Sequence, residues 1–307
     1  MQDHQHREKN ALLPERAREA LEELIARPLA PGLYLVATPI GNLGDISLRA
    51  LAVLARADLI AAEDTRHSKK LLSHFNIQAK LAPYHEHNAA RARPALIARL
   101  RAGDAVALIS DAGTPLVSDP GYRLVREALD QGIMVTSIPG PSAPVAALTS
   151  SGLPTDTFLF AGFLPPKQGA RRTRLLELAA MPATLLFFET APRLAKSLAD
   201  MAEILGAREA AVARELTKLH ETVTRGRLDQ LARELAQAET LKGELVVLVA
   251  PPFPASLDTS DETITAELKR SLKTQSFRDA VRDVTESLGV KRARVYELGF
   301  ALNRKRD

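Results

Sequence analysis

The chain has 307 residues, of which 46% are hydrophobic, enough to fill the cores of two domains of ordinary size. Cysteine is absent, so disulfides and cysteine-based metal or nucleophilic chemistry are excluded, and no apolar run approaches the length that spans a bilayer. The N-terminus is charged and lacks the apolar stretch of a secretory signal, so we expect a cytoplasmic protein. The formal net charge of +4 favours a polyanionic partner only weakly.

Residues 1–30 precede the first strand-like run and form a predicted N-terminal extension. The spacing of Leu21, Leu24 and Ile25 indicates a helix. We interpret this segment as a surface helix or a partly ordered extension of the folded chain.

Residues 31–252 alternate short apolar runs with amphipathic segments, the pattern typical of βα units and a largely parallel sheet. A stretch of Gly, Pro and small polar residues at 150–157 marks a boundary near the middle of the chain. We therefore predict two α/β domains, residues 31–150 and 151–252. The predicted strands span residues 33–38, 59–63, 105–110, 135–138, 157–163, 184–189, 210–215 and 245–250.

Three loops that follow predicted strands stand out, because ligands of open α/β sheets bind beyond the carboxyl ends of the strands. Residues 38–42 form a turn with a single glycine, which is not the G-x-G-x-x-G fingerprint of nicotinamide-binding proteins. Residues 110–121, "SDAGTPLVSDPG", are rich in Gly and Pro and hold Asp111 and Asp119. Residues 139–143, "PGPSA", offer Ser142 as a helix cap. Each could be an ordinary turn, but together they would line one crevice.

A cluster of charges follows the second predicted strand in "AAEDTRHSKK". Glu63 and Asp64 beside Arg66 suit proton abstraction or binding of a substrate hydroxyl. The alternative is a helix start that is capped by Asp64 or Thr65.

Two further groups of polar residues are candidates for a catalytic or a metal site. Glu189 and Arg193 in "LLFFETAPR" are a second-choice catalytic pair, with a structural ion-pair network as the alternative. His85 and His87, on a predicted strand, could supply at most two metal ligands, and we predict no metal site.

Residues 258–307 form a predicted basic helical tail. Its apolar positions repeat at helical spacing, and two helices around "SLGVKRARVYE" resemble a helix-turn-helix whose second helix is basic. Lys291, Arg292 and Arg294 are the predicted RNA-binding residues. The alternative is a small packing domain without nucleic-acid contacts.

Several sequence blocks, in order, join these features. "LYLVATPIGNLGDIS", "AAEDTRHSKKLL", "ISDAGTPLVSDPGY", "PGPSA", "FAGFLP", "LLFFETAPR", "ARELTKLHE" and "KGELVVLV" resemble the successive motifs of the bacterial 16S ribosomal RNA (cytidine-2'-O)-methyltransferases, a branch of the tetrapyrrole-methylase superfamily. The resemblance covers residues 33–250. It implies two α/β domains of the tetrapyrrole-methylase type, S-adenosylmethionine in the cleft between them, a small C-terminal helical module and a homodimer.

The resemblance also places the cofactor contacts. S-adenosylmethionine has no pyrophosphate, which explains why a glycine-rich phosphate loop is not needed. Tetrapyrrole-methylating relatives have Gly-Asp-Pro where this chain has Gly-Thr-Pro at 113–115, so the role of that aspartate does not transfer to Asp111. The implied cofactor-binding residues are Pro39, Ile40, Gly41, Thr114, Pro115, Val117, Ser142, Ala143, Phe188, Ala213 and Glu244.

The expected reaction is an in-line attack of a cytidine 2'-hydroxyl of 16S ribosomal RNA on the methyl group of the cofactor. Asp64 or Glu63 would accept the proton, Arg66 would orient a phosphate or stabilise the alkoxide, and Glu189 is the second choice. An alternative is methylation of a tetrapyrrole or another small metabolite, which would not require the basic tail. A third hypothesis is an RNA-binding or assembly factor that has lost catalysis.

Overall fold

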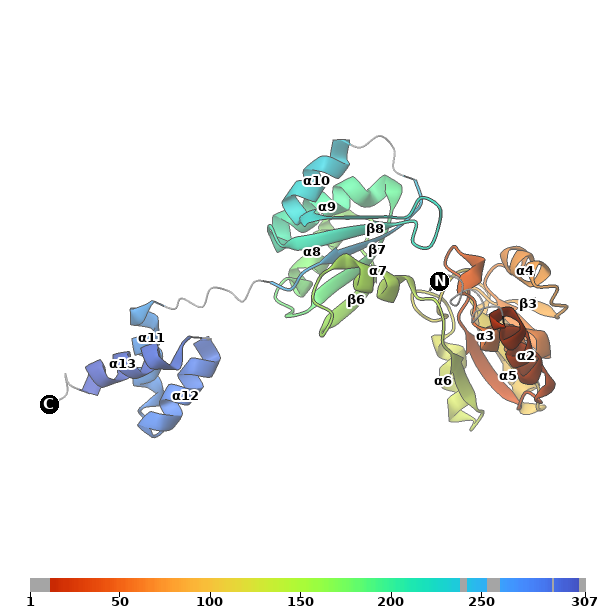
Figure 1. Ribbon diagram of the computed structural model, residues 1–307, viewed down its shortest axis with the longest axis horizontal. Helices are drawn as coiled ribbons and strands as arrows, with labels where there is room; N and C mark the ends of the chain where they lie inside the picture. Colours follow the sequence, from red (N-terminus) through yellow and green to blue (C-terminus); the bar gives the residue numbers. More distant parts are fainter. Residues whose placement is uncertain (1–11, 238–241, 253–259, 289, 304–307) are drawn as a thin grey trace, which may run out of the picture. The chain divides into compact units, whose positions relative to one another are not determined.

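The computed structural model describes residues 12–237, 242–252, 260–288 and 290–303. The chain divides into two compact units, residues 1–251 and residues 252–307 (Figure 1). The helix predicted in the N-terminal extension is confirmed as α2 (Leu13–Ala26), which packs against α3 (Leu48–Arg56). Within the described ranges, none of the helices is long and apolar enough to cross a membrane.

The first sheet has five parallel strands in the order β3-β2-β4-β1-β5. Helices cover both of its faces, so β2 and β4 are buried along their whole lengths and read as continuous apolar runs. One core lies under α3 and α4, and the other under α5 and α6. The elements are β1 (Gly32–Val36), β2 (Leu59–Ala62), β3 (Leu81–Pro83), β4 (Ala105–Ile109), β5 (Val135–Ile138), the short helix η1 (Leu43–Asp45), α4 (Thr65–His74), α5 (Ala89–Arg101) and α6 (Tyr122–Asp130).

The second sheet also has five strands, in the order β6-β7-β10-β8-β9, but it is mixed. Only β6 and β7 pair in parallel, whereas β7, β10, β8 and β9 pair antiparallel. The prediction of a largely parallel arrangement is therefore correct for the first sheet and wrong for the second. The strands are β6 (Phe158–Phe163), β7 (Thr184–Thr190), β8 (Glu209–Arg214), β9 (Thr222–Arg227) and β10 (Glu244–Val249).

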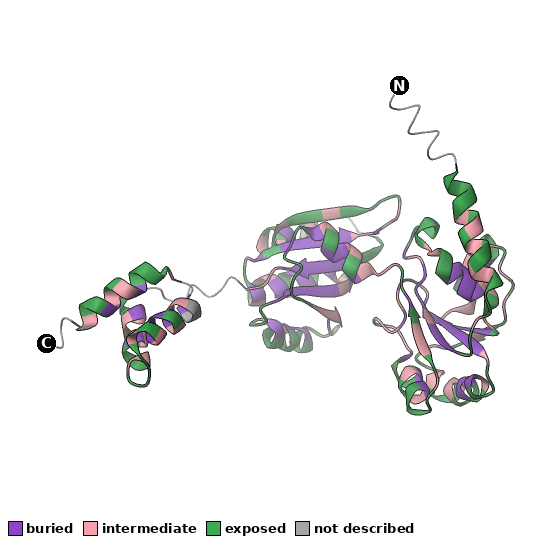
Figure 2. Ribbon diagram, turned by 60° about the horizontal axis from the view of Figure 1, so that its bottom comes forward, coloured by how far each residue is buried: buried purple, intermediate pink, exposed green. Residues whose placement is uncertain are grey.

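Helices cover the two faces of the second sheet unequally. α8 (Gln168–Leu178), α9 (Ala191–Leu205) and α10 (Leu228–Gln237) pack on one face around a large apolar core. The other face carries α7 (Ala143–Ser151), whose Ala147 and Leu148 share a core with this sheet. The central strands of the two sheets, such as β4 and β10, are buried along most of their lengths, and buried residues are purple in Figure 2. The predicted boundary at residue 150 thus falls in the last turn of a helix that packs on the second sheet.

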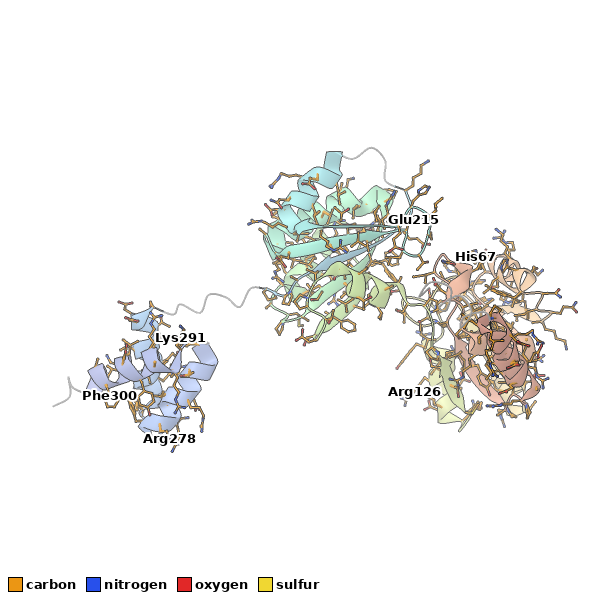
Figure 3. The ribbon with its side chains drawn as sticks, viewed as in Figure 1. His67, Arg126, Glu215, Arg278, Lys291 and Phe300 are labelled. Carbon is orange, nitrogen blue, oxygen red and sulfur yellow. The ribbon has the colours of Figure 1, made fainter. Side chains whose placement is uncertain are left out.

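The described part of residues 252–307 contains three helices: α11 (Asp261–Ser271), α12 (Phe277–Leu288) and α13 (Arg292–Asn303). The apolar face predicted from the sequence is buried at Val281, Val284 and Val295 and forms a core of its own. Phe300 of α13 is more than half exposed and contacts Phe277 at a ring-centroid distance of 5.5 Å (Figure 3). This unit therefore has the apolar core that independent folding requires.

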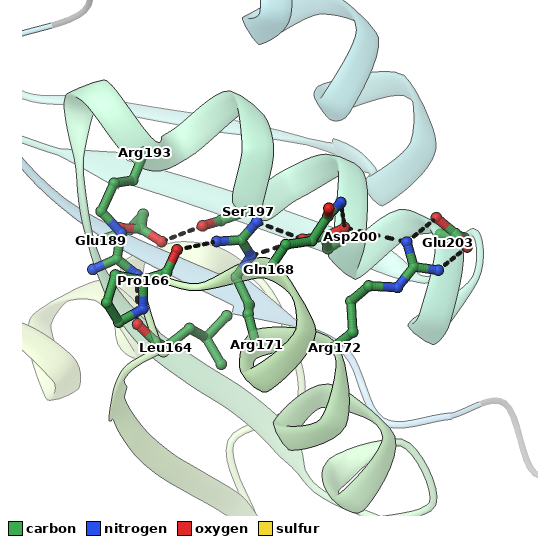
Figure 4. Close-up of polar contacts among 10 residues, drawn as sticks. All are labelled: Leu164, Pro166, Gln168, Arg171, Arg172, Glu189, Arg193, Ser197, Asp200 and Glu203. Atoms are coloured by element: carbon green, nitrogen blue, oxygen red, sulfur yellow. Dashed lines mark hydrogen bonds and ion pairs between the residues drawn. The ribbon is translucent and has the colours of Figure 1, made fainter.

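A buried ion pair joins α8 to α9 on the second sheet (Figure 4). Arg171 and Asp200 have side chains that are only 4% exposed, and Arg171 Nε donates to Asp200 Oδ2 at 2.7 Å. Gln168 Nε2 donates to the other carboxylate oxygen at 3.1 Å, and Arg171 Nη1 donates to the Pro166 carbonyl at 3.2 Å. Both charges are thus paired and hydrogen-bonded, which is the condition for burying them.

Breaking this buried pair should strongly destabilise the protein. We expect Asp200→Asn to lower the free energy of unfolding by roughly 3–5 kcal/mol, because it leaves the Arg171 charge buried and uncompensated. Asp130→Asn is the matched control: Asp130 pairs with Arg126 on the surface of α6, so its loss should cost less than about 1 kcal/mol. Urea denaturation measures both values, and equal losses would contradict the structural role of the Arg171–Asp200 pair.

Candidate functional site

A cavity of about 270 Å³ lies in residues 1–251 where loops of the first sheet meet strand ends of the second. The first sheet contributes the loops that follow β1, β4 and β5. The second sheet contributes the ends of β6, β7, β8 and β10 and the start of the loop after β8. The lining residues are Ile40, Ala112, Gly113, Thr114, Val117, Ser118, Asp119, Ser142, Ala143, Pro144, Phe163, Phe188, Glu189, Thr190, Ala213, Leu216, Gly243, Glu244, Leu245 and Val246.

Backbone contacts hold the three loops of the first sheet together. Thr38 and Gly113 exchange two backbone hydrogen bonds, with N···O distances of 2.9 and 3.0 Å. Gly113 has φ of +80°, and a side chain there would crowd Ile40. Thr114 Oγ1 donates to the Pro141 carbonyl at 3.0 Å. The loops that the sequence analysis assigns to one crevice therefore do meet at one cavity.

Most of the predicted cofactor-binding residues line this cavity, and three do not. The lining set contains Ile40, Thr114, Val117, Ser142, Ala143, Phe188, Ala213 and Glu244, whereas Pro39, Gly41 and Pro115 are outside it. Whether the lining residues contact the cofactor stays a prediction.

Gly41 packs closely against the loop that follows β8. A Cβ atom there would overlap Cγ of Lys218, and the next residue, Asn42, donates its backbone N–H to Thr217 Oγ1 at 3.1 Å. The turn after β1 thus contacts the loop between β8 and β9. Glycine is needed at this position for close approach to that loop, and contact of Gly41 with the cofactor stays a prediction.

Asp64 is the N-cap of α4, so the capping alternative is confirmed. Its Oδ1 accepts from the Arg66 backbone N–H at 2.8 Å, and its Oδ2 lies 3.1 Å from Arg66 Nη2. These bonds from Arg66 lower the pKa of the Asp64 carboxyl to about 2. A carboxylate stabilised in this way is a poor proton acceptor, and neither residue lines the cavity. These contacts favour the capping role of Asp64, and its role as the catalytic base stays a prediction.

Glu189 lines the cavity, but its carboxylate is occupied. Its Oε1 accepts from the Thr190 backbone N–H at 2.8 Å and lies 3.3 Å from Arg193 Nε, and Ser197 Oγ donates to its Oε2 (Figure 4). The Glu189 side chain is fully buried. The structural ion-pair alternative is thus the one that the contacts favour.

Glu244 lies at the cavity beside a second ion-pair cluster. Lys218 Nζ lies 3.1 Å from Glu244 Oε2 and 3.0 Å from Glu215 Oε1, and Glu215 Oε1 also accepts the Glu244 backbone N–H at 3.0 Å. Figure 3 labels Glu215 in the loop that follows β8. These bonds tie that loop to the start of β10 and neutralise part of the charge of Glu244.

Three carboxylates, those of Glu63, Asp111 and Asp119, lie near one another after the ends of β2 and β4. The Asp64 backbone N–H donates to Asp111 Oδ1 at 2.9 Å, which joins the two loops. Burial, followed by the nearby Glu63 and Asp111 charges, raises the pKa of Asp119 to about 6. Burial and Asp111 also raise the pKa of Glu63. Of the three, Asp119 alone lines the cavity, and Glu63 is half-buried.

The sequence analysis missed several lining residues, although the quoted motifs contained them. Asp119 was named in the 110–121 loop but not selected as a site residue, and Ser118 lies beside it. Phe163 belongs to the "FAGFLP" block, and its ring lies 5.4 Å from that of Phe188. Gly243 directly precedes Glu244. The sequence pattern offers no reason to select Leu216, because it is an apolar residue inside the charged "ARELTKLHE" block.

His85 and His87 do not lie on a strand, so that prediction is wrong. β3 ends at Pro83, and both histidines are in the turn before α5, with ring centroids 6.1 Å apart. Within the residues that the structure describes, no group of three or more His, Cys, Asp or Glu side chains is arranged to hold a metal ion.

Comparison with known proteins places this fold and cavity in a family. The sequence model of the tetrapyrrole (corrin/porphyrin) methylases matches residues 32–232. The chain belongs to the tetrapyrrole methylase family. This methylase is 60% identical over 255 residues to a Mesorhizobium japonicum protein named ribosomal RNA small subunit methyltransferase I, covering 81% of this chain and 87% of that protein. A protein of the same name from Erythrobacter litoralis is 51% identical, covering 90% of this chain and 97% of the relative.

Solved structures agree with the expected fold class. Diphthine synthase aligns with a TM-score of 0.54 at 19% identity, covering 71% of this methylase and 89% of that chain. The methyltransferase CobJ aligns with a TM-score of 0.52 at 18% identity, covering 73% and 95%. At these identities the likeness shows the shared fold alone.

The raised pKa of Asp119 predicts a stability that depends on pH. The folded state holds the Asp119 proton to about pH 6, whereas an ordinary aspartate releases it near 3.8, so charging Asp119 destabilises the fold as pH rises between these values. We expect Asp119→Asn to raise the unfolding temperature above pH 6 and to match the wild type below pH 4. Thermal unfolding from pH 3.5 to 8 measures this.

Asp64→Asn is the control, and its unfolding temperature should change in the opposite direction. The pKa of Asp64 is lowered, so its charge stabilises the folded state above pH 4, and the variant should unfold at a lower temperature there. A lower unfolding temperature for Asp119→Asn at pH 7 would contradict the raised pKa of Asp119.

Proposed function

We propose that the protein transfers a methyl group from S-adenosylmethionine to the ribose 2'-hydroxyl of a cytidine in 16S ribosomal RNA of the small subunit. The observation that carries this proposal is 60% identity, over 87% of its length, to a relative named ribosomal RNA small subunit methyltransferase I. The methylase family and the cavity between the two sheets are consistent with it.

The lining of the cavity fits the methyl donor. S-adenosylmethionine carries a positive sulfonium and an ammonium group, and Glu244, whose side chain is 75% exposed, places a carboxylate at the cavity. Apolar side chains such as Ile40 and Phe188 suit an adenosine ring. When bound, the donor supplies an activated methyl group on sulfur and leaves as a neutral thioether.

The contribution of the chain to the reaction is alignment and proton removal. Holding the hydroxyl and the methyl group in line can supply roughly 7–11 kcal/mol of the acceleration. The loops that line the cavity are stiff: the Thr38–Gly113 bridge and the Thr114 bond to the Pro141 carbonyl both restrain them. Such restraint keeps the alignment at little entropic cost during the reaction.

Helix α4 offers a basic surface for the RNA backbone. Arg66, His67, Lys69 and Lys70 are exposed on it, and its ten residues include no acidic side chain. Figure 3 labels His67 on this helix. α4 starts where β2 ends, and its N-cap backbone N–H bonds to Asp111, next to the cavity-lining Ala112. We propose that phosphates of the substrate bind along this helix, which fits a role of Arg66 in orienting the RNA.

The C-terminal unit offers the second basic surface. Lys291, Arg292 and Arg294 are all exposed. Arg294 Nη2 lies 2.7 Å from Asp261 Oδ1, so part of its charge is already neutralised, and the Arg292 guanidinium lies over the Tyr296 ring at 5.8 Å. Lys291 and Arg292 are therefore the stronger candidates for phosphate contacts.

The alternatives predict different binding behaviour. A methylase of a small metabolite would bind S-adenosylmethionine and ignore RNA. An assembly factor without catalysis would bind RNA and take up no S-adenosylmethionine. The homodimer and the cytoplasmic location stay part of this proposal, and light scattering of the purified protein tests the dimer.

Methyl transfer to ribosomal particles tests the proposed function directly. We expect labelled S-adenosylmethionine to methylate small-subunit particles that lack the modification, and nucleotide mapping to find a single 2'-O-methylated cytidine in 16S RNA. Fully modified particles are the control and should accept no methyl group. Transfer to a tetrapyrrole with none to the particles would favour the small-metabolite alternative.

Removing the C-terminal unit should separate RNA binding from cofactor binding. A chain that ends at residue 258 retains the compact unit 1–251, so we expect its affinity for S-adenosylmethionine to stay within about twofold. Its KM for the particles should rise, and the salt dependence of that KM should weaken, because fewer phosphate contacts are made. Calorimetry and steady-state kinetics measure both, and loss of cofactor binding would assign the unit a folding role instead.

A further inference from the structure

The cavity has three acidic lining residues among those described, and only one has no basic partner. Glu189 pairs with Arg193, and Glu244 pairs with Lys218. Asp119 makes no ion pair with any described residue. Because a paired carboxylate is held in its charged form by its partner, Asp119 is the lining acid best suited to take up a proton.

We propose that the carboxylate of Asp119 accepts the proton of the attacking hydroxyl during methyl transfer. The inference rests on the proposed function, because it needs a hydroxyl acceptor. Asp119 takes the place of two earlier candidates for the proton acceptor. Asp64 caps α4, and the Glu189 carboxylate is engaged by Thr190, Arg193 and Ser197.

The backbone around Asp119 is held in an uncommon conformation. Leu116 and Ser118 have positive φ angles of 74° and 68°, although neither is glycine. Gly121 has φ of 143°, and a Cβ atom there would lie 2.9 Å from Leu108 Cδ2. Strained residues of this kind cluster at functional sites, where the surrounding structure fixes them. The two strained residues, Leu116 and Ser118, precede Asp119 in the same loop.

The second sheet also restrains this loop. A Cβ atom on Gly162 of β6 would lie 3.3 Å from Ser118 Oγ, so the strand passes close to the residue before Asp119. Phe163, the next residue, lines the cavity. Asp119 is therefore a half-buried carboxylate in the part of the cavity that the end of β6 also lines.

The charges that face Asp119 tune it for this role. Glu63 after β2 and Asp111 after β4 are both acidic, Ser110 supplies a hydrogen bond that lowers the pKa, and His85 faces Glu63. With burial, the balance leaves the pKa of Asp119 at about 6, near the neutral pH at which a base must work. Asp64, with a pKa of about 2, would be a much weaker base.

The proposed methyl transfer conserves atoms, electrons and charge. The hydroxyl oxygen forms a bond to the methyl carbon as the carbon–sulfur bond breaks, and the bonding electron pair stays on sulfur. The O–H proton moves to Asp119, whose carboxylate becomes neutral and later releases the proton to solvent. The positive charge of the sulfonium is lost, so one neutral thioether and one methyl ether are formed.

Single-turnover kinetics with unmodified small-subunit particles tests this role. We expect Asp119→Asn to lower the rate roughly 10²–10⁴-fold. The affinity for S-adenosylmethionine, measured by calorimetry, should stay within about twofold, because the variant keeps the shape of the side chain. The wild-type rate should rise between pH 5 and 7 and then level, and this rise should be absent from Asp119→Asn. Asp119→Glu, which keeps a carboxylate, should recover part of the rate and the pH dependence.

A control variant and the activity of the wild type distinguish failure of the proposed function from failure of the role of Asp119. Asp130→Asn removes an exposed carboxylate of the same kind at the end of α6 and should keep the wild-type rate. If the wild type transfers no methyl group to the particles, the proposed function fails and this proposal fails with it. If the wild type is active and Asp119→Asn matches it at every pH, only the role of Asp119 is overturned. Loss of cofactor affinity in Asp119→Asn and Asp119→Glu alike would also overturn it, because it would indicate a purely structural residue.

Discussion

The site depends on one apolar contact between the two sheets of residues 1–251. Ile40, from the turn after β1, shares a core with Ala147 and Leu148 of α7 and with Leu186, Ala213 and Val246 of the second sheet. Close-packed apolar surfaces of this kind define position well, because any separation exposes them to water. The contact brings the loops of the first sheet to the strand ends of the second, and the cavity is the space left between them.

Polar contacts then determine what the acidic residues around this site can do. Asp64 receives hydrogen bonds from a helix N-terminus and from Arg66, Glu189 is buried with Arg193, and Glu244 shares Lys218 with Glu215. Each of these arrangements favours the charged carboxylate or occupies its oxygens. Asp119 is instead surrounded by like charges and is partly desolvated. Residues with the same functional group thus acquire different chemistry from their neighbours.

The secondary structure could be predicted wherever a strand is buried on both faces. β1, β2, β4, β7 and β10 read as apolar runs and lie close to their predicted positions. β3 has three residues, none of them buried, and β9, "TVTRGR", is mostly exposed and polar. Neither strand shows the apolar signal that a sequence analysis relies on, because edge strands do not need it. The antiparallel pairing in the second sheet could not be predicted either, because the apolar pattern of a strand reports its burial and not its direction.

The order of motifs by itself determined the family, the fold class and the loops that meet at the cavity, because chain order and turn residues such as Gly113 and Thr114 are local properties. The tertiary structure alone decided which acids are free. Arg193 lies next to Glu189 through helix α9, Lys218 reaches Glu244 across 26 positions of sequence, and Glu63 approaches Asp119 from another strand. The pKa of a carboxylate depends on charges and burial in space, and spatial neighbours are set only when the chain has folded.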